Sequence, residues 1–208
     1  MMSPNDAEAV LPAGAAVPEG IPAGIFAAAV DTFVAGQRLD MRSLARRLGV
    51  ARATLYRRVG NREQLLDQVL WWRARLLLAD QVRASAHLTG TDRLTAVIGG
   101  VLRGIGADRP VRMFLESDPE TALRLLTGAR STVHQGMASA LEKLIDLERE
   151  RGCFDASLDT PTLAYAIVRI SEGFLYSDVI ADRAPDIDRA TTVIEALLTG
   201  LDRRSAPV

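Results

Sequence analysis

Arginine is the side chain that this 208-residue sequence concentrates in one place. Eight arginines fall between residues 38 and 62: Arg38, Arg42, Arg46, Arg47, Arg52, Arg57, Arg58 and Arg62. Asp40 is the only acid there, so the stretch carries +7, whereas the whole chain carries −1 at pH 7. A guanidinium fork binds phosphate oxygens and the acceptor edge of guanine. A strongly basic stretch on an otherwise acidic chain therefore indicates a surface that binds nucleic acid.

Two short predicted helices, Met41–Leu48 and Arg52–Val59, position these arginines. Each has an apolar face marked by two residues four apart: Leu44 with Leu48, then Leu55 with Val59. Between the helices, Gly49 suits the left-handed conformation in which a helix most often ends. A short helix, a glycine turn and a second short helix are the pattern of a helix-turn-helix. The alternative is a solvated basic helix pair that contacts nothing, but charge, turn and spacing agree on DNA.

The second of these helices would lie in the DNA major groove as a recognition helix. Arg52 and Arg57 point away from its apolar face and are predicted to reach base edges, which favours half-sites that contain guanine. Ala53 would offer a methyl contact. Phosphate contacts are predicted for five further residues: Arg42, Thr54, Tyr56, Arg58 and Arg62. An alternative for Tyr56 is packing against the preceding predicted helix, Pro22–Ala35.

The stretch Leu39–Leu70 resembles the DNA-binding domain of TetR-family transcriptional regulators. The matching residues are Leu44-Ala45, Leu48-Gly49-Val50, Thr54-Leu55-Tyr56 and Asn61-Arg62-Glu63-Gln64-Leu65-Leu66. The resemblance is strong over residues 21–80 and weaker afterwards. It implies a homodimeric repressor that binds a palindromic operator in double-stranded DNA and leaves it when a small-molecule effector binds. Repressors and activators of this family are not separated by the sequence.

The remainder of the chain carries no strand alternation and predicts an all-α fold of about nine helices. We expect a disordered tail over 1–20, a three-helix DNA-binding domain over 21–66, a helical ligand-binding and dimerisation domain over 67–202, and a second tail over 203–208. A long helix from Asn61 to about Ser85 would link the two domains. Asn61 and Gln64 have the spacing of a capping box at its start.

One face of the predicted helix that begins near Thr160 is polar and aromatic. It carries Tyr165, Arg169, Glu172 and Tyr176, and the opposite face carries Leu163, Ile167, Ile170 and Phe174. The polar face predicts a pocket in which hydroxyls and a guanidinium orient a small molecule. An equal alternative is a fixed polar network that locks helix packing. Five further residues are candidates to line the same cavity, although each alone is more often core: Trp72, Met113, Phe114, His134 and Met137.

The segment Leu163–Asp186 also resembles a TetR subgroup of actinobacterial regulators of quorum-sensing-signal (lactone) degradation. That resemblance implies an acyl or lactone-like effector. In the family, the last two helices dock against their symmetry mates, and the last predicted helix carries an apolar stripe: Ile194, Leu197, Leu198 and Leu201. The alternative is that this stripe only closes the core of one chain.

Several classes of protein are excluded or disfavoured by what the sequence lacks. It has no run of 18 uncharged apolar residues and no secretory signal, and Cys153 is its only cysteine, so we expect a cytoplasmic protein without disulfides. With no glycine-rich phosphate loop and two distant histidines, His87 and His134, it predicts no metal, no cofactor and no enzyme activity. The alternative function is a helical ligand-binding or catalytic protein that no longer reads DNA.

Overall fold

The computed structural model describes Val10, residues 16–177, Arg183 and residues 185–204, and in this part of the chain the fold is all-α, as predicted. The helices are α2 (Ala23–Val34), α3 (Met41–Arg47), α4 (Arg52–Val59), α5 (Arg62–Ala84), α6 (Gly90–Ala107), α7 (Arg109–Ser117), α8 (Pro119–Thr127), α9 (Thr132–Glu150), α10 (Thr160–Glu172) and α12 (Ile187–Leu201). A π-helical turn, η1 (Gly173–Ser177), continues α10. None of the helices described is long and apolar enough to cross a membrane.

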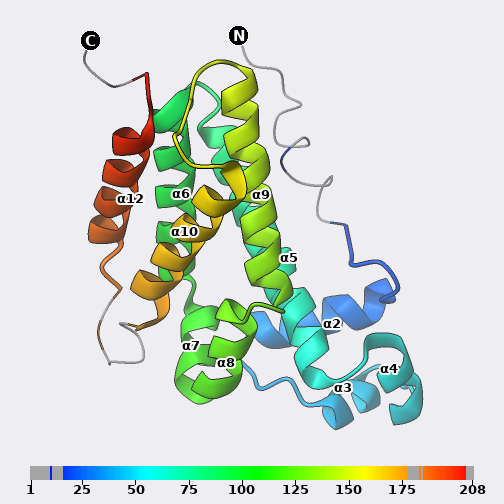
Figure 1. The fold of residues 1–208 in the computed structure, drawn as a ribbon. Coiled ribbons are helices and arrows are strands. Elements are labelled where there is room, and N and C mark those ends of the chain that lie inside the picture. Colours follow the sequence, from blue (N-terminus) through cyan, green and yellow to red (C-terminus); the bar gives the residue numbers. More distant parts are fainter. Residues whose placement is uncertain (1–9, 11–15, 178–182, 184, 205–208) are drawn as a thin grey trace.

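The helices form a small head and a larger body (Figure 1). Helices α2, α3 and α4 gather at one end, while α6, α9, α10 and α12 form a bundle, and α7 and α8 lie at the end of the bundle beside the head. Helix α5 belongs to both parts, because it packs against α2 in the head and against α6, α8 and α9 in the body. Helix α5 therefore links the head and the body.

Local sequence sets where most of these helices begin. Side chains that accept a backbone N–H at the first turn cap six of them: Asp40, Asn61, Asp108, Ser131, Asp159 and Asp186. Asn61 and Gln64 form the predicted capping box, with both hydrogen bonds present. Gly49 has a φ of 66°, the left-handed conformation that its place in the turn predicts. Helix α4 begins without a side-chain cap, since its N-cap residue is Ala51.

Aromatic pairs join the head to the body. The rings of Phe26 on α2 and Trp72 on α5 meet edge to face, with centroids 5.8 Å apart. Phe33 on α2 meets Phe114 on α7 in the same way at 6.1 Å. Edge-to-face rings add roughly 0.5–1.5 kcal/mol beyond the apolar area that they bury. These contacts fix the orientation of α2 against both helices that lead into the body.

The body buries one ion pair completely. Arg93 on α6 and Glu148 on α9 are both fully buried, with Nη1 and Oε1 2.6 Å apart. The second oxygen of Glu148 accepts the Gly90 backbone N–H at 2.7 Å, and Arg151 approaches the first at 3.3 Å. Nothing in the local sequence around Arg93 or Glu148 distinguishes this pair from surface charges, and the sequence analysis did not predict it.

The predicted tails are described in part. Residues 1–9, 11–15 and 205–208 lie outside the described residues, as do residues 178–182, where the helix after Thr160 was predicted to continue to Ala181. Val10 is buried and the Ala16 carbonyl accepts a hydrogen bond from Arg75 on α5. The disordered tail over 1–20 stays a prediction. The backbone N–H of Arg203 donates to the Asp155 carbonyl.

Candidate functional site

Helix α4 presents its polar side outward. Leu55 and Val59 are buried against the head, as their spacing predicts. The residues predicted to contact DNA lie on the remaining surface: Arg52, Ala53, Tyr56, Arg57 and Arg58 are exposed, and Thr54 is half-buried. Arg42, at the start of α3, is exposed as well. Tyr56 is 41% exposed, which places much of its ring in solvent rather than against α2.

A hollow of about 440 Å³ lies between α3, α4 and the first turn of α5. Four predicted contact residues line it together: Arg42, Arg52, Tyr56 and Arg62. Arg38 lines it too, and the sequence analysis counted this residue in the basic stretch without assigning it a contact. Arg38 lies three residues before α3, so helical periodicity could not assign its side chain to a face of the helix. Its positive charge was the one feature of the sequence that indicated a DNA contact. Converging guanidinium groups suit a phosphate oxygen.

Asp40 is the acidic residue that lines this hollow, and its carboxylate accepts a backbone hydrogen bond. Its carboxylate caps α3 by accepting the Ser43 N–H at 2.7 Å. Hydrogen bonds from Ser43 hold the pKa of Asp40 below its ordinary value. The carboxylate is therefore ionised at neutral pH, and the four arginines around it leave the hollow with a net positive charge.

The arginines of the head differ in whether a partner holds them. Arg47 pairs with Asp31 on α2 at 3.0 Å, and Arg46 donates to Ser43 at 3.2 Å. Four predicted contact residues form no ion pair with any residue that the structure describes: Arg42, Arg52, Arg57 and Arg58. Their guanidinium groups are available to an anion from outside the chain.

Arg62 is held at the junction of head and body. Its Nε donates to the Leu39 carbonyl at 3.0 Å, and its Nη1 lies 3.1 Å from Oδ2 of Asp118, the residue before α8. Hydrogen bonds from Thr121 and then from Arg62 hold the pKa of Asp118 below its ordinary value. The predicted phosphate contact of Arg62 therefore competes with an ion pair that the sequence analysis did not anticipate.

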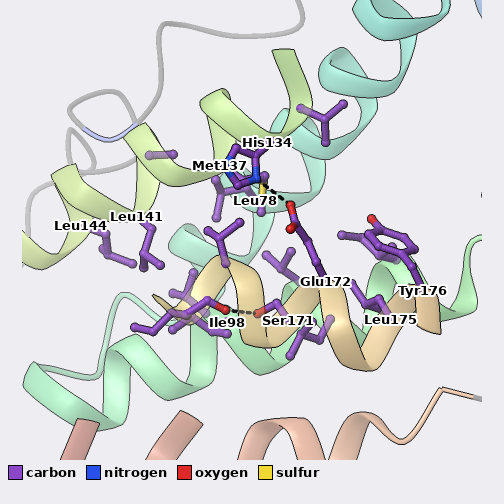
Figure 2. Close-up of a pocket in the computed structure, with 18 residues that line it drawn as sticks. Leu78, Ile98, His134, Met137, Leu141, Leu144, Ser171, Glu172, Leu175 and Tyr176 are labelled. Atoms are coloured by element: carbon purple, nitrogen blue, oxygen red, sulfur yellow. Dashed lines mark hydrogen bonds and ion pairs between the residues drawn. The ribbon is translucent and has the colours of Figure 1, made fainter. Parts of the chain in front are cut away.

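A second candidate site lies inside the body. An apolar cavity of about 70 Å³ is bounded by α5, α6, α9, α10 and η1. Four residues predicted to line a ligand pocket do line it: His134, Met137, Glu172 and Tyr176. Figure 2 shows Leu141 and Leu144 toward one end, Tyr176 at the other, and the contact between His134 and Glu172 between them. The remaining lining residues from α6 and α9 are aliphatic. The sequence around them did not predict that they line a cavity, because any core helix has such residues.

The imidazole and carboxylate groups of the cavity are already paired. His134 Nδ1 lies 2.7 Å from Glu172 Oε1, and Arg169 Nη1 lies 2.8 Å from Glu172 Oε2. Arg169 also donates to the Thr127 carbonyl and, through Nε, to the Tyr165 hydroxyl at 3.1 Å. Tyr165 and Glu172 raise the pKa of Arg169 above its ordinary value. Burial raises the pKa of the Tyr176 hydroxyl, which keeps that group neutral.

The predicted polar face is therefore divided between surface and interior. Glu172 and Tyr176 are buried at the cavity, whereas Tyr165 is 52% exposed and Arg169 lies outside, over the Tyr165 ring at 5.3 Å. Glu172 belongs both to the hydrogen-bonded network with Arg169 and to the cavity wall, so a pocket and a fixed network stay alternative predictions for this face. The stripe runs along α10 from the surface to the interior, so helical spacing alone did not separate the two.

The other predicted pocket residues lie elsewhere. Trp72 packs on Phe26 at the base of the head. Met113 and Phe114 line a different space of about 380 Å³ at the junction of head and body, beside Arg62 and Asp118. The sequence grouped these residues with the cavity by their apolar character, which does not specify where α7 packs. Among the described residues, no group of three or more histidine, cysteine or acidic side chains is arranged to hold a metal ion.

Comparisons with known proteins bear on both sites. Residues 89–199 match a family model described as "Tetracyclin repressor-like, C-terminal domain". No curated protein matches the sequence. The transcriptional repressor QsdR of the TetR family from R. erythropolis is similar in structure, with a TM-score of 0.78 and 29% identity over 86% of this chain and 94% of that chain.

Two further solved structures share the fold at lower identity. FadR from Bacillus subtilis, in complex with stearoyl-CoA, has a TM-score of 0.59 and 17% identity over 85% of this chain and 97% of that chain. FadR from Bacillus halodurans, a fatty acid degradation regulator, has a TM-score of 0.55 and 21% identity over 84% and 95% of the two chains. At these identities the likeness is evidence for the fold alone.

Proposed function

We propose that this chain, which belongs to the tetracyclin repressor-like (TetR) family, is a cytoplasmic repressor and that a small apolar effector releases it from a palindromic operator. Members of this family are transcriptional regulators and not enzymes. The observation that carries the proposal is the basic hollow of the head. It gathers arginines from α3, α4 and α5, and Arg42 and Arg52 in it have no ion-pair partner among the described residues. Free guanidinium groups around one hollow suit the phosphates of double-stranded DNA.

Helix α4 would read bases from the major groove. In this proposal Arg52 and Arg57 reach guanine and Ala53 contacts a methyl group. Arg42, Thr54, Tyr56, Arg58 and Arg62 would hold phosphates, and Arg38 joins them. Exposure of the α4 arginines is consistent with these roles, since a bound strand must displace little protein to meet them.

A palindromic operator requires a homodimer, which places two copies of α4 about one DNA turn apart. The outer side of α12 supplies a suitable surface: Val193 is 42% exposed, and Leu197 and Leu201 are half-buried. Ile194 and Leu198 are completely buried within one chain. The predicted stripe thus divides, with two residues closing the core and two left for a partner subunit.

The effector would occupy the cavity of the body. An apolar lining with one paired polar cluster suits an acyl or lactone-like molecule. The effector releases DNA only if it binds the DNA-incompetent arrangement more tightly than the competent one. Since the cavity measures about 70 Å³, binding must be accompanied by expansion.

A mobility-shift titration tests the proposal. Purified protein is titrated against the intergenic DNA upstream of its own gene, at two salt concentrations, with random-sequence competitor. We expect a shift that survives competitor and weakens with salt in wild type and in Arg83→Ala, a control far from the hollow whose partner is Asp80. The double variant Arg42→Ala, Arg52→Ala should lose the specific shift. If genome-wide selection with the purified protein also recovers no preferred sequence, the repressor assignment is wrong.

A further inference from the structure

Tyr176 lies between two separate spaces in the body. The inner cavity of about 70 Å³ and an outer cleft of about 290 Å³ share three lining residues, Ile105, Val133 and Tyr176. The outer cleft lies where α5, α6 and α7 meet, and Arg73 and Asp108 line it. The inner cavity extends the other way toward Leu144 (Figure 2). One tyrosine ring therefore belongs to the wall of both spaces.

The sizes of the two spaces indicate that they work together. Pockets for small molecules typically measure about 300–1,000 Å³. The inner cavity is far below that range, and the cleft is just below it. Joined, they offer about 360 Å³ before any volume that the tyrosine ring itself vacates. A ligand of ordinary size fits on either side of this wall only if it uses both spaces.

Tyr176 is the movable part of the shared wall. Ile105 and Val133 are set in the regular helices α6 and α9, whereas Tyr176 lies in the π-helical turn η1. Such turns are frequent at functional sites, because one extra residue per turn loosens the helical hydrogen bonding. Displacement of the ring from the wall requires a change of side-chain rotamer. The phenol stays neutral, since burial raises its pKa, so no charge has to be moved with it.

The charges around the two spaces restrict what binds there. At the inner cavity Glu172 is already matched by Arg169 and His134. At the cleft Arg73 lies 2.5 Å from Asp108, and Asp80, which also lines the cleft, is paired with Arg83. Neither space presents an unmatched charge from these groups, so a charged ligand would leave its own charge without a partner in an apolar setting.

We propose that the inner cavity and the outer cleft are two chambers of one binding site, that Tyr176 is the partition between them, and that the ligand is an elongated, uncharged amphiphile. Its chain passes the displaced tyrosine ring into the inner chamber, and its polar end stays at the cleft beside the Arg73–Asp108 pair. The inference rests on the proposed effector site and deepens it. In the unliganded protein, closing of the partition lowers the apparent affinity for any ligand long enough to span both chambers.

Straight-chain alcohols of two lengths test the partition. Binding of 1-octanol and 1-butanol to the full-length protein is measured by isothermal titration calorimetry. We expect Tyr176→Ala to bind 1-octanol about tenfold more tightly than wild type, because the partition no longer has to be displaced, and to gain much less for 1-butanol. Tyr176→Phe keeps the ring and should match wild type within about twofold for both alcohols.

Leu144→Ala is the matched control, since it enlarges the inner chamber at the end away from the partition (Figure 2). It should improve 1-butanol binding and leave 1-octanol binding nearly unchanged. The proposal is overturned if Tyr176→Ala shows the same ratio of the two affinities as wild type, or if Leu144→Ala gains as much for 1-octanol as Tyr176→Ala does.

A crystal of the wild-type protein soaked with 8-bromo-1-octanol keeps the proposal testable if Tyr176→Ala does not fold. Anomalous signal from bromine in the inner chamber, with the tyrosine ring rotated out of the wall, supports the partition. Bromine and hydroxyl both in one chamber, or both outside, overturn it. Neither experiment involves DNA, so an operator that fails to bind would overturn the proposed repressor and leave this result unaffected.

Discussion

The head and the body of this molecule treat charge in opposite ways. In the head, Arg52 and Arg57 stand exposed on α4 without an ion-pair partner among the described residues. In the body, Arg93 and Glu148 are withdrawn from water completely and matched to one another. An exposed arginine contributes little to stability and is free to bind a ligand, whereas a buried arginine must be paired with an opposite charge in the folded state. The same residue type therefore serves recognition at one end and fixed packing at the other.

The largest loss of stability is expected when the buried ion pair of the body is broken at Glu148. Glu148→Ala removes the carboxylate that lies 2.6 Å from the fully buried Arg93 and should lower the free energy of unfolding by about 3–5 kcal/mol. Urea denaturation followed by circular dichroism measures the loss. Asp80→Ala is the control, because it breaks an exposed pair with Arg83 and should cost less than about 1 kcal/mol. Equal losses for the two variants would show that burial does not separate the two kinds of charge.

The next effect belongs to the head and should leave stability unchanged. Arg52→Ala is expected to weaken operator binding by about 1–3 kcal/mol and to relax the preference for guanine at the base that it contacts. Fluorescence anisotropy with the operator and with single-base variants measures both quantities. Arg83→Ala provides the comparison, since it removes an exposed arginine of the body. Wild-type affinity and unchanged base preference in Arg52→Ala would remove this residue from the reading surface.

The sequence predicts features within a single helix of the head better than it predicts contacts between helices. The bounds of α4, its buried pair Leu55 and Val59, and its exposed arginines follow from the spacing of apolar residues within a few positions, although the start of α4 has no side-chain cap. The partner of Arg62 does not, because Asp118 is distant in the chain and reaches it through the packing of α8 on α5. Contacts within one helix are encoded locally, whereas a pair between helices depends on how several helices pack at once.

The cavity shows the same limit of local patterns. Glu172 and Tyr176 were predicted as pocket residues from one polar stripe, and they are buried at the cavity. Met113 and Phe114 were grouped with them on apolar character alone and lie at the junction with the head. Periodicity assigns a residue to a face of its helix, but the position of that helix decides which space the face meets.

Arg62 tests whether a residue can belong to both regions. If it leaves Asp118 for a phosphate when DNA binds, Asp118→Ala should strengthen operator binding by up to about 1 kcal/mol, the worth of a partly exposed pair. Arg62→Ala should weaken binding to all sequences and lower the salt slope by about one. Salt-dependent anisotropy titrations measure both. If Asp118→Ala weakens operator binding as much as Arg62→Ala does, the ion pair stabilises the DNA-binding arrangement of the head instead.

The pH dependence of that pair has a definite sign. The pKa of Asp118 is lowered in the folded protein, so the pair contributes stability above the ordinary carboxyl pKa near 4 and loses it as pH falls through the lowered value. Titration of Asp118 should therefore add no change in operator affinity between about pH 5 and pH 8. A change in that window that disappears in Asp118→Ala would contradict this assignment.

The smallest expected effect concerns the uncapped start of α4. Ala51 lies at the N-cap with an extended backbone, the conformation from which a serine hydroxyl accepts an N–H of the first turn. Ala51→Ser should therefore raise the free energy of unfolding by about 0.5–1 kcal/mol, visible as an increase in Tm of a few degrees. Ala53→Ser is the matched control, since it adds the same hydroxyl inside the helix, where it caps nothing. A similar Tm for the two variants would show that the start of α4 is satisfied in some other way, and that the head gives up no stability by presenting this helix end to DNA.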